Sequence, residues 1–195
     1  MTLSFFAEGA RRGFWPLLVV AAFTSACAPM WPAPPARPVQ PAVIAVSQLS
    51  EAERTFMTRV AASGLYEVEV SRLAASRATF PAVRTYAQML ASHHEKANQE
   101  LAALMRAKGL ESPAGLAADK ATKLYRLSAL RPSAEFDRGY VRVVGVEDHT
   151  ASVALFEQAQ RDVRDRDLRA WIDRTLPVLR THLDSARALS STLAG

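Results

Sequence analysis

Apolar residues recur every three or four positions along most of the chain beyond residue 50, the spacing that places one buried face on an α-helix. This pattern predicts four long helices, at about 51–79, 81–108, 133–163 and 165–193, and a short helix around 118–130. Ser50 and Glu53 form a capping-box sequence where the first helix should begin. Short turns join the first helix to the second and the third to the fourth, so each pair should be an antiparallel hairpin.

The predicted fold class is therefore all-α: a four-helix bundle in residues 50–195, with a long connection between its second and third helices. A low aromatic content, 8%, and few glycines also favour helices over sheets. The connection, about 109–132, is long enough for either an up-down bundle or one with a crossover.

Each long helix carries one side chain that can bind a metal on its otherwise apolar inner face. In the second helix the inner stripe is Val83, Ala87, Leu90, His94, Ala97, Leu101 and Leu104. The equivalent residue is His149 in the third helix, His182 in the fourth and Glu67 in the first. At 1.5 Å per residue, each of these four residues lies roughly 20–25 Å from its hairpin turn, near the middle of its helix. The four side chains should therefore meet in one layer of the bundle.

Such a layer has two physical explanations. One is a metal site with Glu67, His94, His149 and His182 as ligands, suited to Zn, Cu or Fe. The other is a buried hydrogen-bond network in which the same groups satisfy one another or a trapped water. His93 is one position off the stripe and is expected at the surface. Asp148 is either a partner of His149 or a solvated charge.

The first residues have the order of a secretory signal: Arg11 and Arg12, a short apolar stretch from 14 to 23, and small residues before Cys27. The sequence from 23 to 27 resembles a bacterial lipobox, which implies cleavage after residue 26 and acylation of Cys27. Six prolines between 28 and 42 favour an extended tether within residues 27–49. With Ala28 after the cysteine, the resemblance implies an outer-membrane lipoprotein facing the periplasm. The alternative is an ordinary signal peptide and a soluble periplasmic protein.

The net charge of +5 does not indicate a nucleic-acid-binding protein, because basic and acidic residues alternate without a basic run. The single cysteine excludes an intramolecular disulfide. No nucleophile elbow, phosphate loop or zincin motif is visible, so the sequence gives no support for an enzyme.

Several short motifs resemble a bacterial family known as domain of unknown function 4142. They span about 51–189: Leu65-Tyr66-Glu67-Val68, Leu73-Ala74, Tyr86-Ala87-Gln88-Met89, Phe136-Asp137-Arg138-Gly139-Tyr140, Asp148-His149 and Thr175-Leu176-Pro177. The resemblance implies a ferritin-like bundle and a place in the cell envelope, without an activity to carry over. The family has Asp-His where this chain has His93-His94.

A ferritin-type di-iron site needs Glu three residues before His on two helices, and this chain has Ala91, Val146 and Leu179 there. Two functions remain. One is an envelope protein that binds a metal ion in mid-bundle. The other is a metal-free envelope scaffold or stress-related interaction protein with a structural His/Glu layer.

Overall fold

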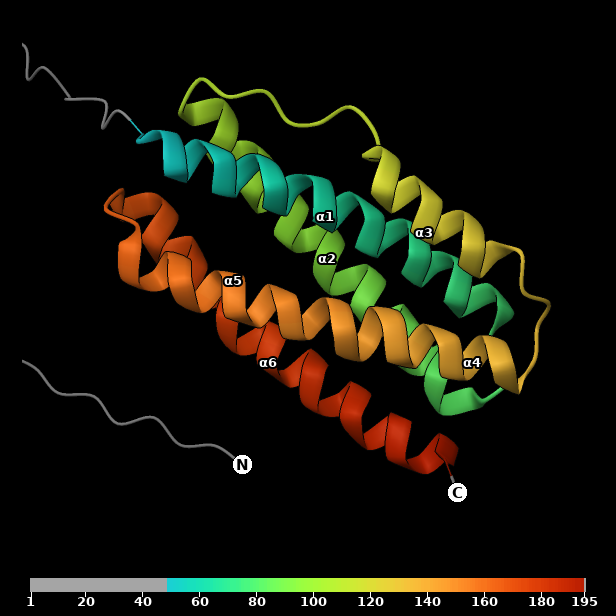
Figure 1. Cartoon of the computed structure of the whole chain (residues 1–195). Helices are drawn as coiled ribbons and strands as arrows, with labels where there is room; N and C mark the ends of the chain where they lie inside the picture. Colours follow the sequence, from blue (N-terminus) through green and yellow to red (C-terminus); the bar gives the residue numbers. More distant parts are fainter. Residues whose placement is uncertain (1–48, 195) are drawn as a thin grey trace, which may run out of the picture. The chain divides into compact units, whose positions relative to one another are not determined.

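The computed structural model describes residues 49–194, in which every regular element is helical (Figure 1). The elements are α1 (Glu51–Arg77), α2 (Pro81–Ala107), α3 (Ala118–Ser128), α4 (Ala134–Tyr140), η1 (Val141–Asp148), α5 (His149–Asp162) and α6 (Arg166–Ala194). The all-α prediction is confirmed for these residues, and the predicted helices agree to within a few residues. The predicted signal peptide, Cys27 and nearly all of the tether lie outside the described residues. No helix in 49–194 has a stretch long and apolar enough to cross a bilayer.

The capping box at the start of α1 is confirmed and also joins two distant parts of the chain. The Ser50 hydroxyl accepts the Glu53 N–H, and the Glu53 carboxylate accepts the Ser50 N–H at 2.7 Å. The other Glu53 oxygen accepts the backbone N–H groups of Arg164 (2.8 Å) and Asp165 (2.9 Å). The start of α1 is therefore held beside the turn between α5 and α6.

A second buried carboxylate fixes the opposite end of the molecule. Asp137, at the start of α4, accepts hydrogen bonds from the backbone N–H of Phe80 (2.8 Å) and from the Thr79 N–H and hydroxyl. The start of α4 thus lies at the turn between α1 and α2, while the α5–α6 turn lies at the far end. The two hairpins point in opposite directions, and the long connection must cross the length of the molecule between them. Figure 1 shows this crossover, with α3 running along α1.

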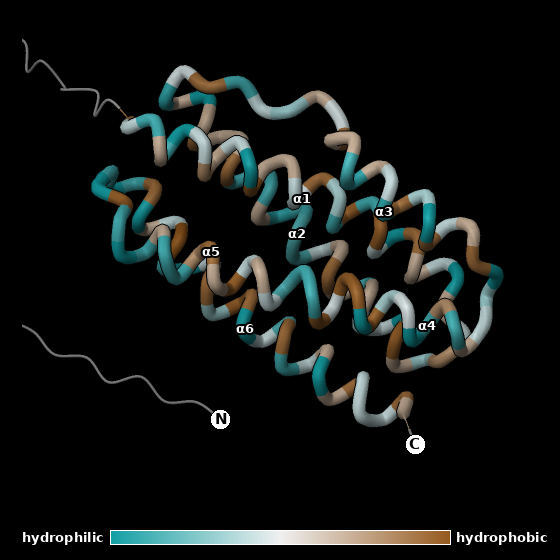
Figure 2. The backbone as a smooth tube through the Cα atoms, viewed as in Figure 1, coloured by the Kyte–Doolittle hydropathy of each residue, from teal (hydrophilic) through white to brown (hydrophobic). Residues whose placement is uncertain are grey.

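The core consists of two apolar clusters with a polar layer between them. One cluster contains Phe56, Met57, Leu101, Phe156, Trp171 and Leu179, and the other contains Tyr66, Leu90, Phe136, Tyr140, Val144 and Ala186. His94, His149 and His182 lie between the two clusters along α2, the third helical segment and α6. In Figure 2, polar positions interrupt the apolar ones along each of these helices.

The predicted helix at 133–163 is continuous, but its middle is a π-helix, η1, that sequence periodicity did not predict. Gly145 lies within η1, and a Cβ atom there would come within 2.7 Å of the Ala186 Cβ. Since glycine has no Cβ, η1 can approach α6 more closely than any other residue would allow. π-Helical turns are often found at functional sites, and η1 leads directly into His149.

Candidate metal centre

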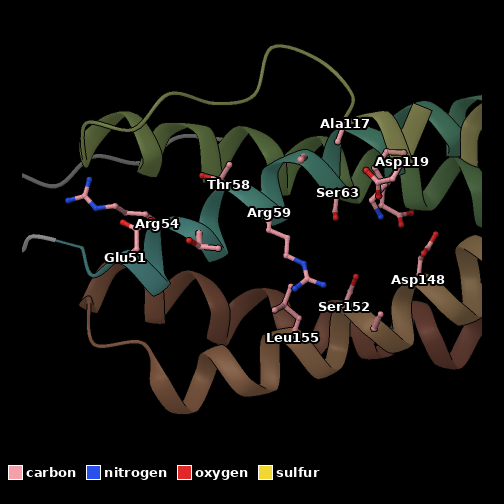
Figure 3. A pocket seen from close by; sticks show the side chains of 15 residues that line it. Glu51, Arg54, Thr58, Arg59, Ser63, Ala117, Asp119, Asp148, Ser152 and Leu155 are labelled. Atoms are coloured by element: carbon pink, nitrogen blue, oxygen red, sulfur yellow. The ribbon is translucent and has the colours of Figure 1, made fainter. Parts of the chain in front are cut away.

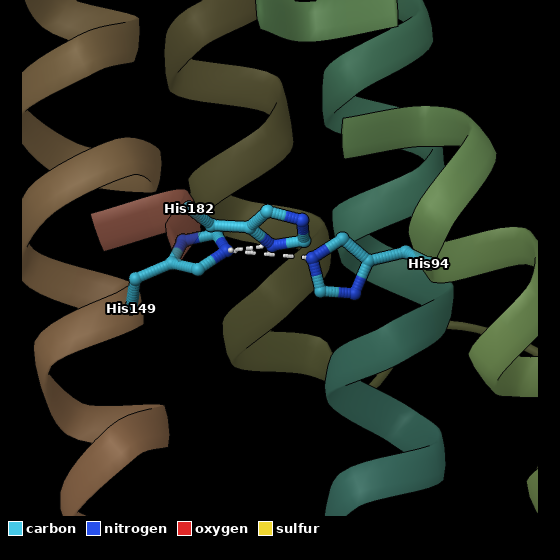
Figure 4. Close-up of side chains that lie close together, drawn as sticks. All are labelled: His94, His149 and His182. Carbon is cyan, nitrogen blue, oxygen red and sulfur yellow. Dashed lines mark hydrogen bonds between the residues drawn. The ribbon is translucent and has the colours of Figure 1, made fainter. Parts of the chain in front are cut away.

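Three histidines from three different helical segments meet between the two apolar clusters. His94 comes from α2, His149 is the first residue of α5, and His182 comes from α6 (Figure 4). The His149 Nε2 atom lies 3.4 Å from His94 Nε2 and 3.2 Å from His182 Nδ1. One ring nitrogen from each residue lies within 4.8 Å of the other two. We call this group the histidine triad.

Burial keeps the three imidazoles neutral. His149 and His182 are each 1% exposed and His94 is 9% exposed. Desolvation is the main cause that lowers the pKa of each ring, to about 3 for His182, and the neighbouring rings lower the pKa values of His94 and His182 further. A neutral imidazole keeps a lone pair on one ring nitrogen, which is the form that binds metal ions.

The outer nitrogens of two triad rings are anchored, and this sets which nitrogens face inward. His149 Nδ1–H donates to the carbonyl oxygen of Val144 in η1 at 2.8 Å. The proton on Nδ1 leaves the lone pair of His149 Nε2 pointing at the other two rings. The outer nitrogen of His182, Nε2, lies 2.9 Å from His93 Nδ1. Anchoring of this kind is typical of metal-binding histidines.

His93 belongs to the same cluster, a contact that the sequence did not predict. It is exposed, as expected, but its ring stacks on that of His182 with centroids 5.1 Å apart. All four histidines of the chain are therefore in contact. The stripe pattern missed this contact because it places a side chain by its Cβ direction, whereas a histidine ring reaches further. The adjacent pair His93-His94 was the available signal.

Glu67 is buried near the triad but is not a member of it. Its side chain is 5% exposed, and its Oε2 atom has no hydrogen-bond partner among the described residues. Desolvation, and then the charge of Asp148, raise the pKa of Glu67 to about 8, although Lys120 and Lys123 act in the opposite direction. Glu67 lines a small, partly enclosed cavity together with His94.

On its other side Glu67 forms part of an open groove of about 560 Å³ between α1 and α5 (Figure 3). Asp148 lines the same groove. One of its oxygens pairs with Lys123 at 2.5 Å, and the other, Oδ2, is buried and has no partner within residues 49–194. The groove wall carries charges of both signs, because Arg54, Arg59 and Lys120 line it together with Glu51 and Asp119.

The spacing of the triad nitrogens fits a metal ion. Ligands about 2.0–2.1 Å from a tetrahedral ion lie about 3.4 Å from one another. Two of the three separations in the triad, 3.2 and 3.4 Å, match this value. The buried histidine triad can therefore hold a metal ion, and three imidazole nitrogens suit Zn, Cu or Fe.

A family model described as domain of unknown function (DUF4142) matches residues 38–189. The chain belongs to the DUF4142 family. The match includes every described helix up to residue 189 and all members of the histidine triad. Among curated proteins, none matches this DUF4142 chain.

The crystal structure of a DUF305 fragment from Deinococcus radiodurans is similar in fold to this DUF4142 protein. The TM-score is 0.65, and the alignment covers 74% of this chain and 98% of the fragment. Sequence identity is 14%, so the similarity concerns the arrangement of helices alone.

Proposed function

We propose that this DUF4142 protein binds one transition-metal ion in the middle of a ferritin-like four-helix bundle. His94, His149 and His182 supply three nitrogen ligands, and Glu67 faces the fourth side of the ion. The observation that carries the proposal is the convergence of three neutral ring nitrogens at ligand spacing, with the outer nitrogens of two rings anchored.

The crossover between α2 and α4 supports the ferritin-like description, because that connection distinguishes ferritin-type bundles from simple up-down ones. A single ion suits the donor set better than a pair. Carboxylates bridge the two metals of a di-iron centre, but Glu67 is the one carboxylate that lines a cavity with a triad member in the described residues.

The four histidines can also satisfy one another through hydrogen bonds, without a metal. His149 Nε2 can accept hydrogen bonds from His94 Nε2–H and His182 Nδ1–H, and His182 Nε2 can then accept from His93 Nδ1–H. This network supports the second candidate function, a scaffold whose polar layer fixes the helix register. However, it makes one nitrogen accept two donors, one of them at 3.4 Å, which is long for a hydrogen bond.

Elemental analysis of the full chain, purified without an affinity tag or chelator, tests the proposal. We expect about one equivalent of Zn, Cu or Fe in the wild type, and none in a variant with His94→Ala and His182→Ala. Ser71→Ala is the matched control, because Ser71 is buried and its hydroxyl pairs with Tyr140 away from the triad. A folded wild-type chain that contains no metal and cannot be loaded with Zn²⁺, Cu²⁺ or Fe²⁺ would leave only the scaffold function.

We further propose that Cys27 is acylated and anchors the protein to the outer membrane on its periplasmic side. The support comes from the sequence alone: the basic, apolar and small-residue segments before Cys27, and the proline-rich segment after it. A tether of this composition would place the metal site away from the membrane surface. The membrane, rather than a nucleic acid, is then the expected partner.

A further inference from the structure

A small, partly enclosed cavity lies beside His94 of the histidine triad. Its volume is about 50 Å³, and residues from α1, α2, α5 and α6 line it. Its polar lining includes His94, Glu67 and Trp171, and its apolar lining includes Phe156 and Leu179. The cavity is large enough for a molecule of about three heavy atoms, since a cavity volume of about 10–15 Å³ is sufficient to hold one water.

In the part of the chain that the structure describes, three buried side-chain polar atoms have no partner, and two of them belong to residues that line this one cavity. Trp171 is 2% exposed, and its Nε1–H donates to no group in residues 49–194. Glu67 Oε2 is likewise unpaired. Leaving a buried polar group unpaired costs about 1–3 kcal/mol, so native proteins rarely contain two in one place without a ligand. One unpaired atom is a donor and the other belongs to a carboxyl group, so a single small polar molecule can satisfy both.

We propose that this cavity is a binding site for a small oxygen- or nitrogen-donor molecule, of the size of water or azide, that completes the coordination of the metal ion. The molecule accepts a hydrogen bond from Trp171 Nε1–H, contacts Glu67 and occupies the fourth coordination position of the ion. This inference rests on the proposed metal site. Three histidine ligands with a fourth exchangeable position are typical of metal sites that react with small molecules, rather than of purely structural ones.

The cavity also has a route to solvent. The cavity and the open groove between α1 and α5 share four lining residues: Ser63, Glu67, Ser152 and Leu155. The partition between them is therefore one layer of side chains. Figure 3 shows Ser63, Ser152 and Leu155 on the two helices that face each other across the groove. The cavity is only partly enclosed, so a small molecule can enter it, and its volume of about 50 Å³ does not suit a larger one.

Azide binding to the cobalt-loaded protein tests the inference. The protein is the full chain with Trp15→Phe and Trp31→Phe, which leaves Trp171 as its single indole. We expect saturable azide binding, seen as a shift in the visible absorption of Co²⁺ and a change in Trp171 fluorescence. Trp171→Phe should weaken azide binding about ten-fold by absorption, because it removes the hydrogen-bond donor and keeps most of the ring volume. Cobalt uptake should not change.

A cavity-filling variant provides the second arm. Ala97 lines the cavity from α2, whereas Ala103 lies on the exposed face of the same helix. Ala97→Val should abolish the azide shift with cobalt still bound, and Ala103→Val should behave as wild type. This inference is wrong, and the metal site stands, if cobalt binds to the wild type but azide does not. It is also wrong if Trp171→Phe and Ala97→Val each bind azide as tightly as the wild type does. If cobalt does not bind to the wild type, the metal site itself is wrong.

Discussion

Burial moves the pKa values of the triad histidines and of Glu67 in opposite directions. Desolvation lowers the pKa of each triad histidine, whereas it raises that of Glu67 to about 8. Each shift favours the neutral form of its side chain, because a buried charge is costly. The metal-free folded protein therefore contains a nearly uncharged polar layer at neutral pH.

These shifts predict a stability maximum of the metal-free protein near neutral pH. Below the unfolded histidine value of about 6.5, the unfolded chain binds protons at the triad that the folded chain excludes, so stability falls as the pH falls. Between about 4.5 and 8 the folded chain keeps a proton on Glu67 that the unfolded chain has lost, so this group makes stability fall as the pH rises. The free energy of unfolding should change more steeply on the acid side of this maximum, on the order of 2 kcal/mol per pH unit, because the effect of three histidines there exceeds the opposite effect of one carboxyl group.

Urea unfolding of the EDTA-treated chain between pH 5 and 9 measures this profile. Glu67→Gln should flatten the alkaline side and make the acid side steeper, because an amide does not titrate and so no longer opposes the three histidines. A profile that is flat below pH 6.5 would show that the histidines are protonated in the folded protein and would contradict their burial as neutral groups.

At the scale of single residues, the sequence predicted the position of the triad well and its surroundings poorly. A 3.6-residue period was sufficient to place His94, His149 and His182 on inner faces, since each interrupts an apolar stripe. The pattern could not show that His93 reaches back to His182, or that Trp171 and Glu67 are unpaired in a common cavity. Those facts depend on side-chain directions and on packing between helices, which a one-dimensional pattern does not contain.

The π-helix η1 determines how the third helical segment presents His149. Val144 and Gly145 are buried, while Val146 is partly buried and packs against the core. Val144 is five residues before His149, and its carbonyl accepts the Nδ1–H of that histidine. A five-residue repeat is the spacing of a π-turn, not of an α-turn, so an α-helical period did not predict the contact between Val144 and His149.

Gly145→Ala should therefore disturb the metal site by moving η1 away from α6. The new Cβ would lie 2.7 Å from the Ala186 Cβ and 3.3 Å from the Tyr86 hydroxyl. The Ala186 Cβ is fixed to its backbone, so the helices must separate, and overpacking of this kind costs about 1–3 kcal/mol. We expect a lower melting temperature and weaker Co²⁺ binding, because Tyr86 also donates to the backbone carbonyl of His182.

Gly139→Ala is the matched control, measured by the same thermal unfolding and cobalt titration. Its Cβ would lie 3.7 Å from the nearest side-chain atom, which is an ordinary contact. Alanine also has a higher helix propensity than glycine, so this variant should be as stable as wild type or more so. Equal losses in the two variants would mean that η1 and α6 do not need their close approach.

At the scale of the whole molecule, the sequence predicted the two hairpins but not how they are joined. The long connection from 109 to 132 allowed both topologies, because its length satisfies either. The crossover follows from two buried carboxylates whose partners are distant in sequence: Glu53 at the α5–α6 turn and Asp137 at the α1–α2 turn. Lys108 adds an ion pair with Asp165 at 2.7 Å, which places the end of α2 at the start of α6. No local pattern predicts such contacts, since each partner looks like an ordinary polar residue near a helix end.

The proposed anchor makes a prediction that is independent of the helical domain. Cys27→Ser should abolish incorporation of labelled palmitate in a bacterial host. It should also release the protein from the membrane fraction, because in this proposal the lipid on Cys27 provides the attachment to the membrane. Pro32→Ala, in the tether, should leave both labelling and membrane attachment as in the wild type. Metal content should be the same in all three proteins, because the triad ligands lie more than sixty residues beyond the cysteine. A wild-type chain that is exported and cleaved but never labelled would instead identify an ordinary signal peptide, and the metal-binding domain would then act free in the periplasm.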